Sequence, residues 1–283
     1  MKNLTLFYTM IFSISTVQAG DELRVMSFNL RYINPGDRAE KTWVARRDQV
    51  AAVMKADRAD FIGVQEAFRA MLDDVKERLP EFSEVGVGRE NGKEQGEYSA
   101  ILYRSSVWER LDGGTFWLSD TPDVPNSAHW GNSVVRICTW GKFRHKLDRR
   151  EILFYNTHFD HESQPCREKG ATLIVRKISD QQGSLPVVVV GDLNAAPDNP
   201  AIACFTVARP KLIDVWAALR PHVSVQESGT FHGFHGNTDG ARIDYIFSSE
   251  QLRAKDVEIV RANENGVYPS DHYPVRASFV WKD

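Results

Sequence analysis

The segment PVVVVGDLNAAPDNP, residues 186–200, places Asp192 and Asn194 directly after four consecutive valines. A carboxylate at the end of an apolar strand most often caps the turn that follows. Several other apolar segments of this chain, however, also carry acids, amides or imidazoles at or near their ends. These side chains are Asn29, Glu66, Asn156, His158, Asp160, His161, Asp244, Asp271 and His272.

Taken one at a time, these residues have structural explanations. Asn29 fits a turn, Glu66 fits the first turn of a helix, and His158 fits a hydrogen-bonded core position. Asp244 fits an ion pair with Arg242. As a set they are harder to explain, because burying so many polar side chains costs several kcal/mol unless they satisfy one another or a cation.

The chemistry of the set indicates a hard cation. If the strands lie side by side, their ends supply carboxylates, amides and imidazoles but no thiolate. Such donors suit Mg²⁺, with Mn²⁺ or Ca²⁺ as alternatives. The sequence therefore predicts a metal-assisted active site where these strand ends meet.

The elements that position these residues begin as β-α-β-α. Residues 23–32 alternate as a strand, and residues 43–56 have apolar side chains at helical spacing. Residues 59–66 form a short apolar strand, and residues 70–79 form a second amphipathic helix.

After Pro80 the pattern becomes that of successive antiparallel strands with turn-length gaps, up to about residue 160. A helix over 166–181 then leads into the valine strand, two short helices lie within 199–219, and the last third is again strands. Two β-rich halves with helices predict a four-layer α/β/β/α sandwich. In it, two mixed, mainly antiparallel sheets pack face to face with helices outside.

The first residues are expected to be a signal peptide. Lys2 precedes an apolar run that is too short and too polar to span a bilayer, and Val17-Gln18-Ala19 has small residues at the positions that a signal peptidase recognises. We therefore expect residues 1–19 to be removed, residues 20–283 to form one domain, and the mature chain to be secreted or periplasmic without stable membrane insertion. A buried N-terminal strand or a lipid-facing anchor is the alternative.

Composition narrows the partners. The chain is 42% hydrophobic and 26% charged, which is ordinary for a globular protein. Without residues 1–19, which hold one lysine and no acid, its net charge is −4. The one basic cluster, residues 144–150, fits a hairpin turn, so nucleic acid is a less favoured substrate. Export would make Cys138, Cys166 and Cys204 candidates for one disulfide and one free thiol, with the pairing left open.

The order of these segments resembles the endonuclease/exonuclease/phosphatase superfamily, the deoxyribonuclease I-like, Mg²⁺-dependent phosphoesterases, and within it a secreted or membrane-associated bacterial branch. The resemblance runs from Asn29 to His272 and depends mainly on GDLN (191–194) followed by SDHYP (270–274). It implies a hydrolase acting on phosphate esters with a divalent metal.

The resemblance also implies roles for single residues. Glu66 is the principal metal ligand, with Asn29 beside it and Asp271 as a further ligand. Asp192 and Asn194 position the attacking water and bind phosphoryl oxygens. The last group is His272 as the catalytic imidazole, Asp244 as the acid that orients it, and His158 as the histidine that donates to the phosphate. Whether His272 or Asp192 takes the proton is left open.

The expected substrate contacts lie in loops around the site. Arg136 and Glu97 stand where some relatives have a phosphate-contacting arginine and a supporting acid. Trp130 and His232 belong to aromatic loops, 114–132 and 229–240, that suit the rim of a pocket or its packing.

The leading hypothesis for function is an exported, metal-dependent phosphoesterase that hydrolyses a small or exposed ester such as a sugar phosphate, a nucleotide or a lipid head group. Hydrolysis would proceed by in-line attack of water. The alternatives are an extracellular nuclease and, less favoured, a catalytically idle binding protein on the same scaffold. Oligomeric state and the number of metals stay open.

Overall fold

A computed structural model describes residues 22–207 and 209–282, and within them two six-stranded sheets. The predicted signal peptide lies outside the described residues. The first sheet has the order β11 (Leu252–Ile259), β12 (Val275–Trp281), β1 (Glu22–Asn29), β2 (Phe61–Ala67), β4 (Tyr98–Arg104) and β3 (Phe82–Val85). The second sheet has the order β5 (Trp108–Trp117), β6 (Ile137–His145), β7 (Glu151–His158), β8 (Val187–Asp192), β10 (Asp244–Ser249) and β9 (Leu212–Asp214).

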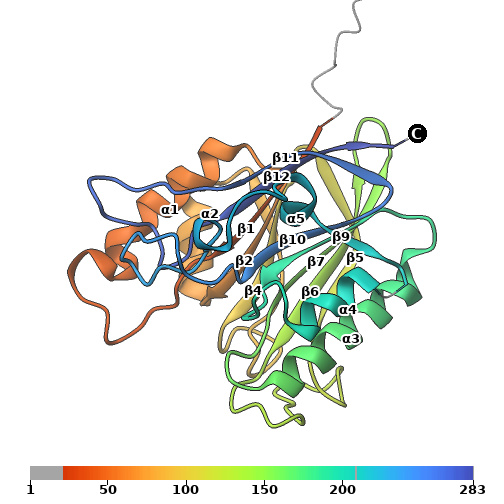
Figure 1. Cartoon of the computed structure of the whole chain (residues 1–283), viewed down its shortest axis with the longest axis horizontal. Coiled ribbons are helices and arrows are strands. Elements are labelled where there is room, and N and C mark those ends of the chain that lie inside the picture. Colours follow the sequence, from red (N-terminus) through yellow and green to blue (C-terminus); the bar gives the residue numbers. More distant parts are fainter. Residues whose placement is uncertain (1–21, 208, 283) are drawn as a thin grey trace, which may run out of the picture.

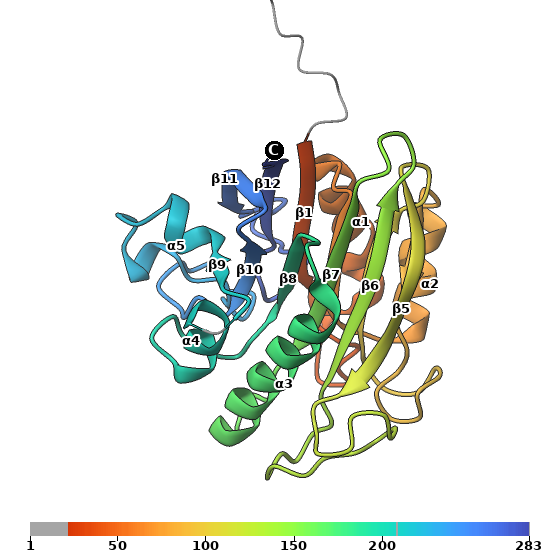
Figure 2. The same cartoon turned by 90° about the vertical axis from the view of Figure 1, so that its right-hand side faces the viewer.

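Helices cover the outer face of each sheet, so the four-layer α/β/β/α sandwich is confirmed. Figure 1 shows α1 and α2 on one side of the strands and α3 and α4 on the other, and Figure 2 shows α3 in front of the second sheet. The helices are α1 (Trp43–Asp57), α2 (Arg69–Arg78), α3 (Gln164–Gln182), α4 (Pro200–Val207) and α5 (Val215–Leu219). No helix within the described ranges has the length and apolar character needed to cross a bilayer.

The four valines of β8 show how this layering follows from the sequence. Val188 and Val190 belong to the core between the two sheets, whereas Val187 and Val189 belong to the core between the second sheet and helices α3 and α4. Alternate side chains of a strand point to opposite faces. A strand that is covered on both faces is therefore apolar at every position, and β8 stays apolar until Asp192 ends it.

The sequence suggested that each half of the chain forms one sheet, but the structure does not divide in this way. The C-terminal strands β11 and β12 join the first sheet beside β1, while β10 joins the second. The expected antiparallel run after Pro80 also splits, because β3 and β4 belong to the first sheet and β5 to β7 belong to the second. Strand pairing across the molecule depends on which edges are free, and local periodicity does not report this.

Two parallel pairs bring the site residues to one edge. β1 pairs in parallel with β2, and β7 pairs in parallel with β8, while the other strand pairs are antiparallel. Carboxyl ends of parallel neighbours meet at the same edge of a sheet. The registers Asn29↔Gln65 and His158↔Asp192 place those strand ends side by side.

The two sheets approach closely beneath this edge. A Cβ at Gly63 would lie 2.3 Å from a Val190 methyl carbon, so only glycine fits there. Asn156 of the second sheet crosses this contact, since its Nδ2 donates to Val64 O at 2.9 Å and to Ala100 O at 2.7 Å in the first sheet. Its Oδ1 accepts from Gln65 Nε2 at 2.7 Å. Asn156 therefore fixes the two sheets together, and its place among the polar strand ends has a structural explanation.

All three cysteines are free thiols, so the expected disulfide is absent from the structure. They lie on β6, α3 and α4, and Cys138 and Cys166 are buried.

The helix α3, which carries Cys166, starts two residues earlier than predicted. Ser163 Oγ accepts from Cys166 N at 3.4 Å as its N-cap, and a proline occupies the first turn, where its missing N–H costs nothing.

Candidate active site

Glu66 is aimed by an irregularity in its strand. The β2–β4 register shifts between Val64 and Ala67, and Glu66 has a φ of 60°. A left-handed residue at a bulge is uncommon for a side chain other than glycine and re-aims that side chain. Glu66 Oε2 then accepts from Tyr32 N at 3.0 Å, which fixes the carboxylate at the edge of the cavity.

Asn29 joins the two acids of the two sheets. Its Nδ2 donates to Glu66 Oε1 at 3.0 Å and to Asp192 Oδ2 at 2.9 Å. Its Oδ1 accepts from Arg31 N at 2.9 Å, so the orientation of the amide follows from its partners. The structure therefore presents Asn29 as a shared donor that holds two carboxylates together, and not as the metal ligand that was expected, because its oxygen faces the backbone.

Asp192 is buried at the centre of the site. Besides the contact with Asn29, its Oδ1 accepts from Asn194 N at 3.0 Å. Burial, together with the nearby Asp244, raises the pKa of Asp192 to about 7. A carboxylate in this position is well suited to exchange a proton near neutral pH.

His272 forms the predicted pair with Asp244. Its Nδ1 lies 2.9 Å from Asp244 Oδ2, and its Nε2 lies 3.8 Å from Asp192 Oδ2. Burial disfavours the charged ring, but the carboxylates of Asp244 and Asp192 outweigh it and raise the pKa of His272 well above its ordinary value. Nδ1 therefore donates to Asp244, and Nε2 faces the centre of the site.

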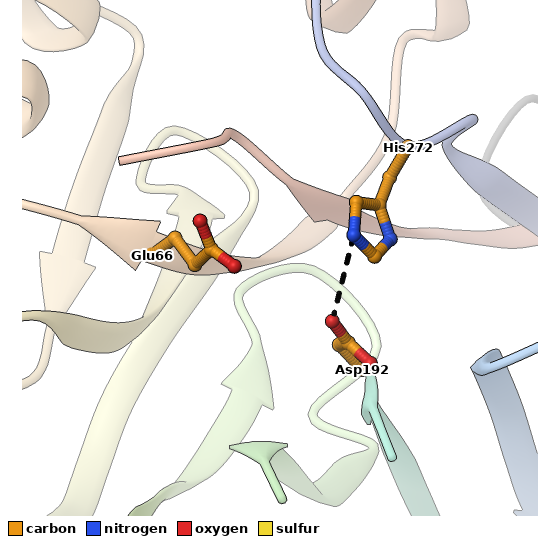
Figure 3. A group of neighbouring side chains, drawn as sticks. All are labelled: Glu66, Asp192 and His272. Atoms are coloured by element: carbon orange, nitrogen blue, oxygen red, sulfur yellow. Dashed lines mark ion pairs between the residues drawn. The ribbon is translucent and has the colours of Figure 1, made fainter. Parts of the chain in front are cut away.

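Three of these side chains converge on one point. Glu66, Asp192 and His272 each offer a ligand atom, and the three atoms all lie within 4.8 Å of one another. Figure 3 shows the three side chains pointing toward a common space from different strands and a loop. Two carboxylates and an imidazole form an oxygen- and nitrogen-rich donor set that fits a divalent cation. Asp271, the other expected ligand, lies outside this group of three.

Asp271 instead faces an arginine. Its Oδ2 lies 3.5 Å from Arg31 Nη1, and Arg31 also donates to Asp37 at 3.1 and 3.3 Å. Asp271 still lines the same cavity and is buried, and burial raises its pKa. It therefore contributes negative charge beside the three converging ligand atoms.

His158 and Asn194 also lie beside Asp192, and His158 faces the same carboxylate oxygen as His272 does. Asn194 Nδ2 donates to Phe159 O at 3.0 Å and lies 3.0 Å from His158 Nε2, which itself is 3.5 Å from Asp192 Oδ2. Burial, with Arg136 and Arg89 nearby, lowers the pKa of His158 well below its ordinary value. His158 is therefore a neutral ring whose Nε2 accepts from Asn194, while its Nδ1 is buried without a hydrogen-bond partner.

Arg136 is a buried cation with little compensation. Its Nη2 lies 3.0 Å from His161 Nδ1, and its ion-pair contact with Asp160 is long, at 3.9 Å. Arg136 Nε has no hydrogen-bond partner. Burial, with Arg89 nearby, lowers the pKa of Arg136. A buried guanidinium that lines the cavity in this state favours an anionic ligand.

Glu97 is paired inside the same cavity. Its two carboxylate oxygens accept from both Nη atoms of Arg89, at 2.7 and 3.0 Å. Burial nevertheless raises the pKa of Glu97. Glu97 therefore holds Arg89 in place, which fits the supporting acid that was expected here.

Two expected substrate contacts lie elsewhere. Trp130 packs on the core beside α3, its Nε1 donates to Asp120 Oδ1 at 2.7 Å, and it lines a separate cavity with Lys169. His232 is buried and stacks on Tyr273, with ring centroids 4.0 Å apart. Both predictions were drawn from loop composition, and an aromatic loop residue packs inward as readily as it faces a ligand.

The cavity itself has a volume of about 510 Å³. It contains six residues that the sequence analysis did not propose for the site: Arg31, Tyr32, Arg89, Val134, Phe231 and Ile243. Phe231 is 43% exposed and lies edge-on to His272, with ring centroids 5.0 Å apart. The lining residues are Arg31, Tyr32, Glu66, Arg89, Glu97, Val134, Arg136, His158, His161, Asp192, Asn194, Phe231, Ile243, Asp271 and His272.

Comparison with known proteins shows which family this chain belongs to. Residues 26–272 match the model of the endonuclease/exonuclease/phosphatase family. The chain belongs to this family. It is accordingly a hydrolase that acts on phosphoester bonds, and its family depends on divalent metals.

Solved structures of other family proteins are similar over nearly the whole chain. An endonuclease/exonuclease/phosphatase from Bacteroides vulgatus is 34% identical with a TM-score of 0.85, and the match covers 92% of this chain and 99% of that chain. A mannosyl-6-phosphatase of Bacteroides thetaiotaomicron is 34% identical with a TM-score of 0.82, over 92% and 100% of the two chains. Among curated protein sequences, an uncharacterized protein of Acanthamoeba polyphaga mimivirus is 27% identical over 161 residues, covering 54% of this chain and 59% of its own length.

Proposed function

We propose that this family member is an exported phosphoesterase that hydrolyses a small, exposed phosphate ester by in-line attack of water. The observation that carries the proposal is the convergence of Glu66, Asp192 and His272 in one cavity that also presents Arg136. An anionic cluster beside a buried guanidinium suits a phosphate group bridged to a cation. Mg²⁺ is the proposed ion, with Mn²⁺ or Ca²⁺ as alternatives.

The cation would be held mainly by the Glu66 carboxylate at this point of convergence, and when bound it would stabilise the negative charge that develops on the phosphoryl oxygens. Asp192 Oδ2 lies 3.5 Å from His158 Nε2 and 3.8 Å from His272 Nε2, and Asp192 lines the cavity, so we assign it the role of taking the proton of the attacking water. His272 is oriented through Nδ1 by Asp244 and presents Nε2 to the reacting phosphate. Asp244 thus acts as the third group that, as a general rule, holds a catalytic base or acid in its orientation.

The choice of a small monoester as the leading substrate rests on two observations. A relative that is 34% identical over nearly its full length is a mannosyl-6-phosphatase, which hydrolyses a sugar phosphate by its name. In addition, Phe231 gives the cavity an exposed aromatic face beside His272, and a sugar ring or a base packs well on such a face. Nucleic acid remains the second substrate class.

The proposal of export rests on residues 1–19, which we interpret as a signal peptide. N-terminal sequencing of the protein from its native host would test this proposal. We expect a mature chain that begins at Gly20. A chain that retains Met1 in the cytoplasm would refute export without affecting the chemistry.

The activity is tested by a panel of esters with purified residues 20–283. We expect p-nitrophenyl phosphate and sugar phosphates to be hydrolysed with Mg²⁺ and not with EDTA. Bis-p-nitrophenyl phosphate should turn over more slowly. Nicking of plasmid DNA in preference to these esters would support the nuclease, and absence of turnover on every ester would support an idle binding protein.

A further inference from the structure

A second arginine, Arg46, is buried near the site, and none of the carboxylates in the described ranges contacts it directly. It is fully buried in the first turns of α1. Its Nε donates to Lys41 O at 2.8 Å, and its Nη2 donates to Arg31 O at 3.0 Å. Its Nη1 donates to Leu30 O at 2.8 Å and to Pro269 O at 2.5 Å. Four of its five N–H groups thus end on backbone carbonyls.

Three of those four carbonyls, of Leu30, Arg31 and Pro269, belong to segments that carry the site. Leu30 directly follows Asn29, and Arg31 lines the cavity. Pro269 precedes Ser270, Asp271 and His272. The two segments are more than 230 residues apart in sequence, and Arg46 reaches both with one planar group.

A second contact in this region runs parallel to the first. Ser270 Oγ donates to Asn29 O at 2.7 Å and accepts from His272 N at 3.3 Å. The Arg46 guanidinium also lies 5.5 Å from the centre of the Phe234 ring, in the loop 229–240 that pairs with Asp271 through backbone N–H groups. The end of β1, the 269–272 segment and the 229–240 loop are therefore held by one side chain.

We infer that Arg46 is a positioning residue for the phosphoesterase reaction: it fixes the end of β1 against the segment 269–272, and so sets the distance between Asn29 with its two carboxylates and His272. A buried charge without a carboxylate partner is costly, and it is retained where its hydrogen bonds specify one arrangement. The inference rests on the proposed activity only for its kinetic readout.

The test compares Arg46→Ala and Arg46→Lys with the control Arg47→Ala. Arg47 is the next residue of the same helix and pairs with Asp74 at 3.0 Å, outside the cavity. A displacement of about 1 Å at a reacting group costs roughly 100-fold in rate. We expect Arg46→Ala to lose roughly this factor in kcat with KM changed less than about threefold, and Arg47→Ala to keep its rate.

Two readouts separate positioning from a general loss of structure. Guanidinium ion at millimolar concentration should restore at least about tenfold of the Arg46→Ala rate and leave wild type and Arg47→Ala unchanged, because it can occupy the space of the lost group. Amide exchange should speed up in 28–34 and 264–273 and not in β6 and β7.

Arg46→Lys covers the case in which the alanine variant does not fold. An ammonium cannot reach carbonyls of three segments at once, so we expect about a tenfold loss of kcat in a folded protein. A folded Arg46→Lys or Arg46→Ala with wild-type kcat and wild-type exchange would overturn the inference. A wild-type protein without turnover on any ester would instead refute the proposed activity, and the exchange experiment would still decide the role of Arg46.

Discussion

Charged residues lie around both ends of β1, but they are paired with opposite charges at one end and grouped with like charges at the other. At the end that starts the strand, Arg24 pairs with Glu22 at 2.8 Å, and Arg276 pairs with Asp57 at 3.2 Å and also with Glu258. Each acid there meets an arginine, and the arginines are about 40% exposed or more. At the other end, Glu66 and Asp192 are held together by the neutral amide of Asn29.

The difference separates a structural cluster from a functional one. Both ends have a hollow lined by acids and arginines. Opposite charges in direct contact near solvent need nothing further and contribute little stability. Two buried carboxylates that share only a neutral donor repel each other, and this lowers the stability of the folded protein. A bound cation removes that cost.

The largest effect should come from removing the central acid. Asp192→Asn is expected to lower kcat roughly 10²–10³-fold, the size found when one stabilising group of an active site is deleted. Its free energy of unfolding in EDTA should stay the same or rise, because a buried like charge is removed. Steady-state kinetics and urea unfolding check both; an Asp192→Asn protein that is less stable and fully active would contradict the comparison.

Removal of the weakly paired Arg136 cation should distinguish two classes of ester. Arg136→Met is expected to lower kcat/KM for a monoester roughly 30-fold, which corresponds to about 2 kcal/mol of lost transition-state stabilisation. The reason is the loss of a charge-assisted hydrogen bond to the dianion. The loss should be smaller for the singly charged bis-p-nitrophenyl phosphate. The control is Arg144→Met, because Arg144 lies on β6, which begins directly after Arg136, and pairs with Glu151 outside the cavity. Equal losses for both esters would argue against this role.

Conversion of the shared donor into a third acid should sharpen the contrast in stability. Asn29→Asp replaces the amide NH₂ group that donates to two carboxylates. We therefore expect the free energy of unfolding to fall by about 1–3 kcal/mol in EDTA, and Mn²⁺ to restore part of this loss. Asn91→Asp is the matched control, because Asn91 uses only its oxygen, accepting from Lys93 N and Gln95 N. Denaturant unfolding with and without Mn²⁺ measures both. If the two variants behave alike, the donor role of Asn29 is wrong.

The starting end of β1 should respond in the opposite sense. Arg276→Met removes the partner of Asp57, so we expect a loss of about 1 kcal/mol in stability. Turnover should stay within about twofold of wild type, since no residue of the cavity contacts Arg276. A large loss of activity in this variant would show that the two ends are coupled.

The smallest effect concerns pH. Burial raises the pKa of Asp57 above its ordinary 3.8, although Arg276 opposes the shift. The folded protein therefore binds this proton more tightly than the unfolded chain, and the contribution of Asp57 to stability falls as the pH rises from about 4 through the raised pKa. Asp57→Asn should flatten this fall, so its stability relative to wild type should improve from pH 4 to pH 7. Thermal unfolding at both pH values measures the difference.

Much of the fold was predictable because its signals are local. The alternation in β1, the helical spacing in α1 and the unbroken valines of β8 depend on neighbours within a few residues, and these elements appear where they were expected. The pairing of β12 with β1 was not predictable in this way. It joins residues about 250 positions apart, and a strand carries no local mark of the edge to which it adds.

The sequence by itself determined the elements, the family resemblance and the types of side chain at the strand ends, because periodicity and short motifs are properties of the chain. Only the tertiary structure decided that Asn29 donates to two acids, that Arg89 and Phe231 line the cavity, and that Trp130 does not. These outcomes depend on which atoms face one another once two sheets have packed, and hydrogen-bond geometry at that contact is set by positions that the linear order does not contain.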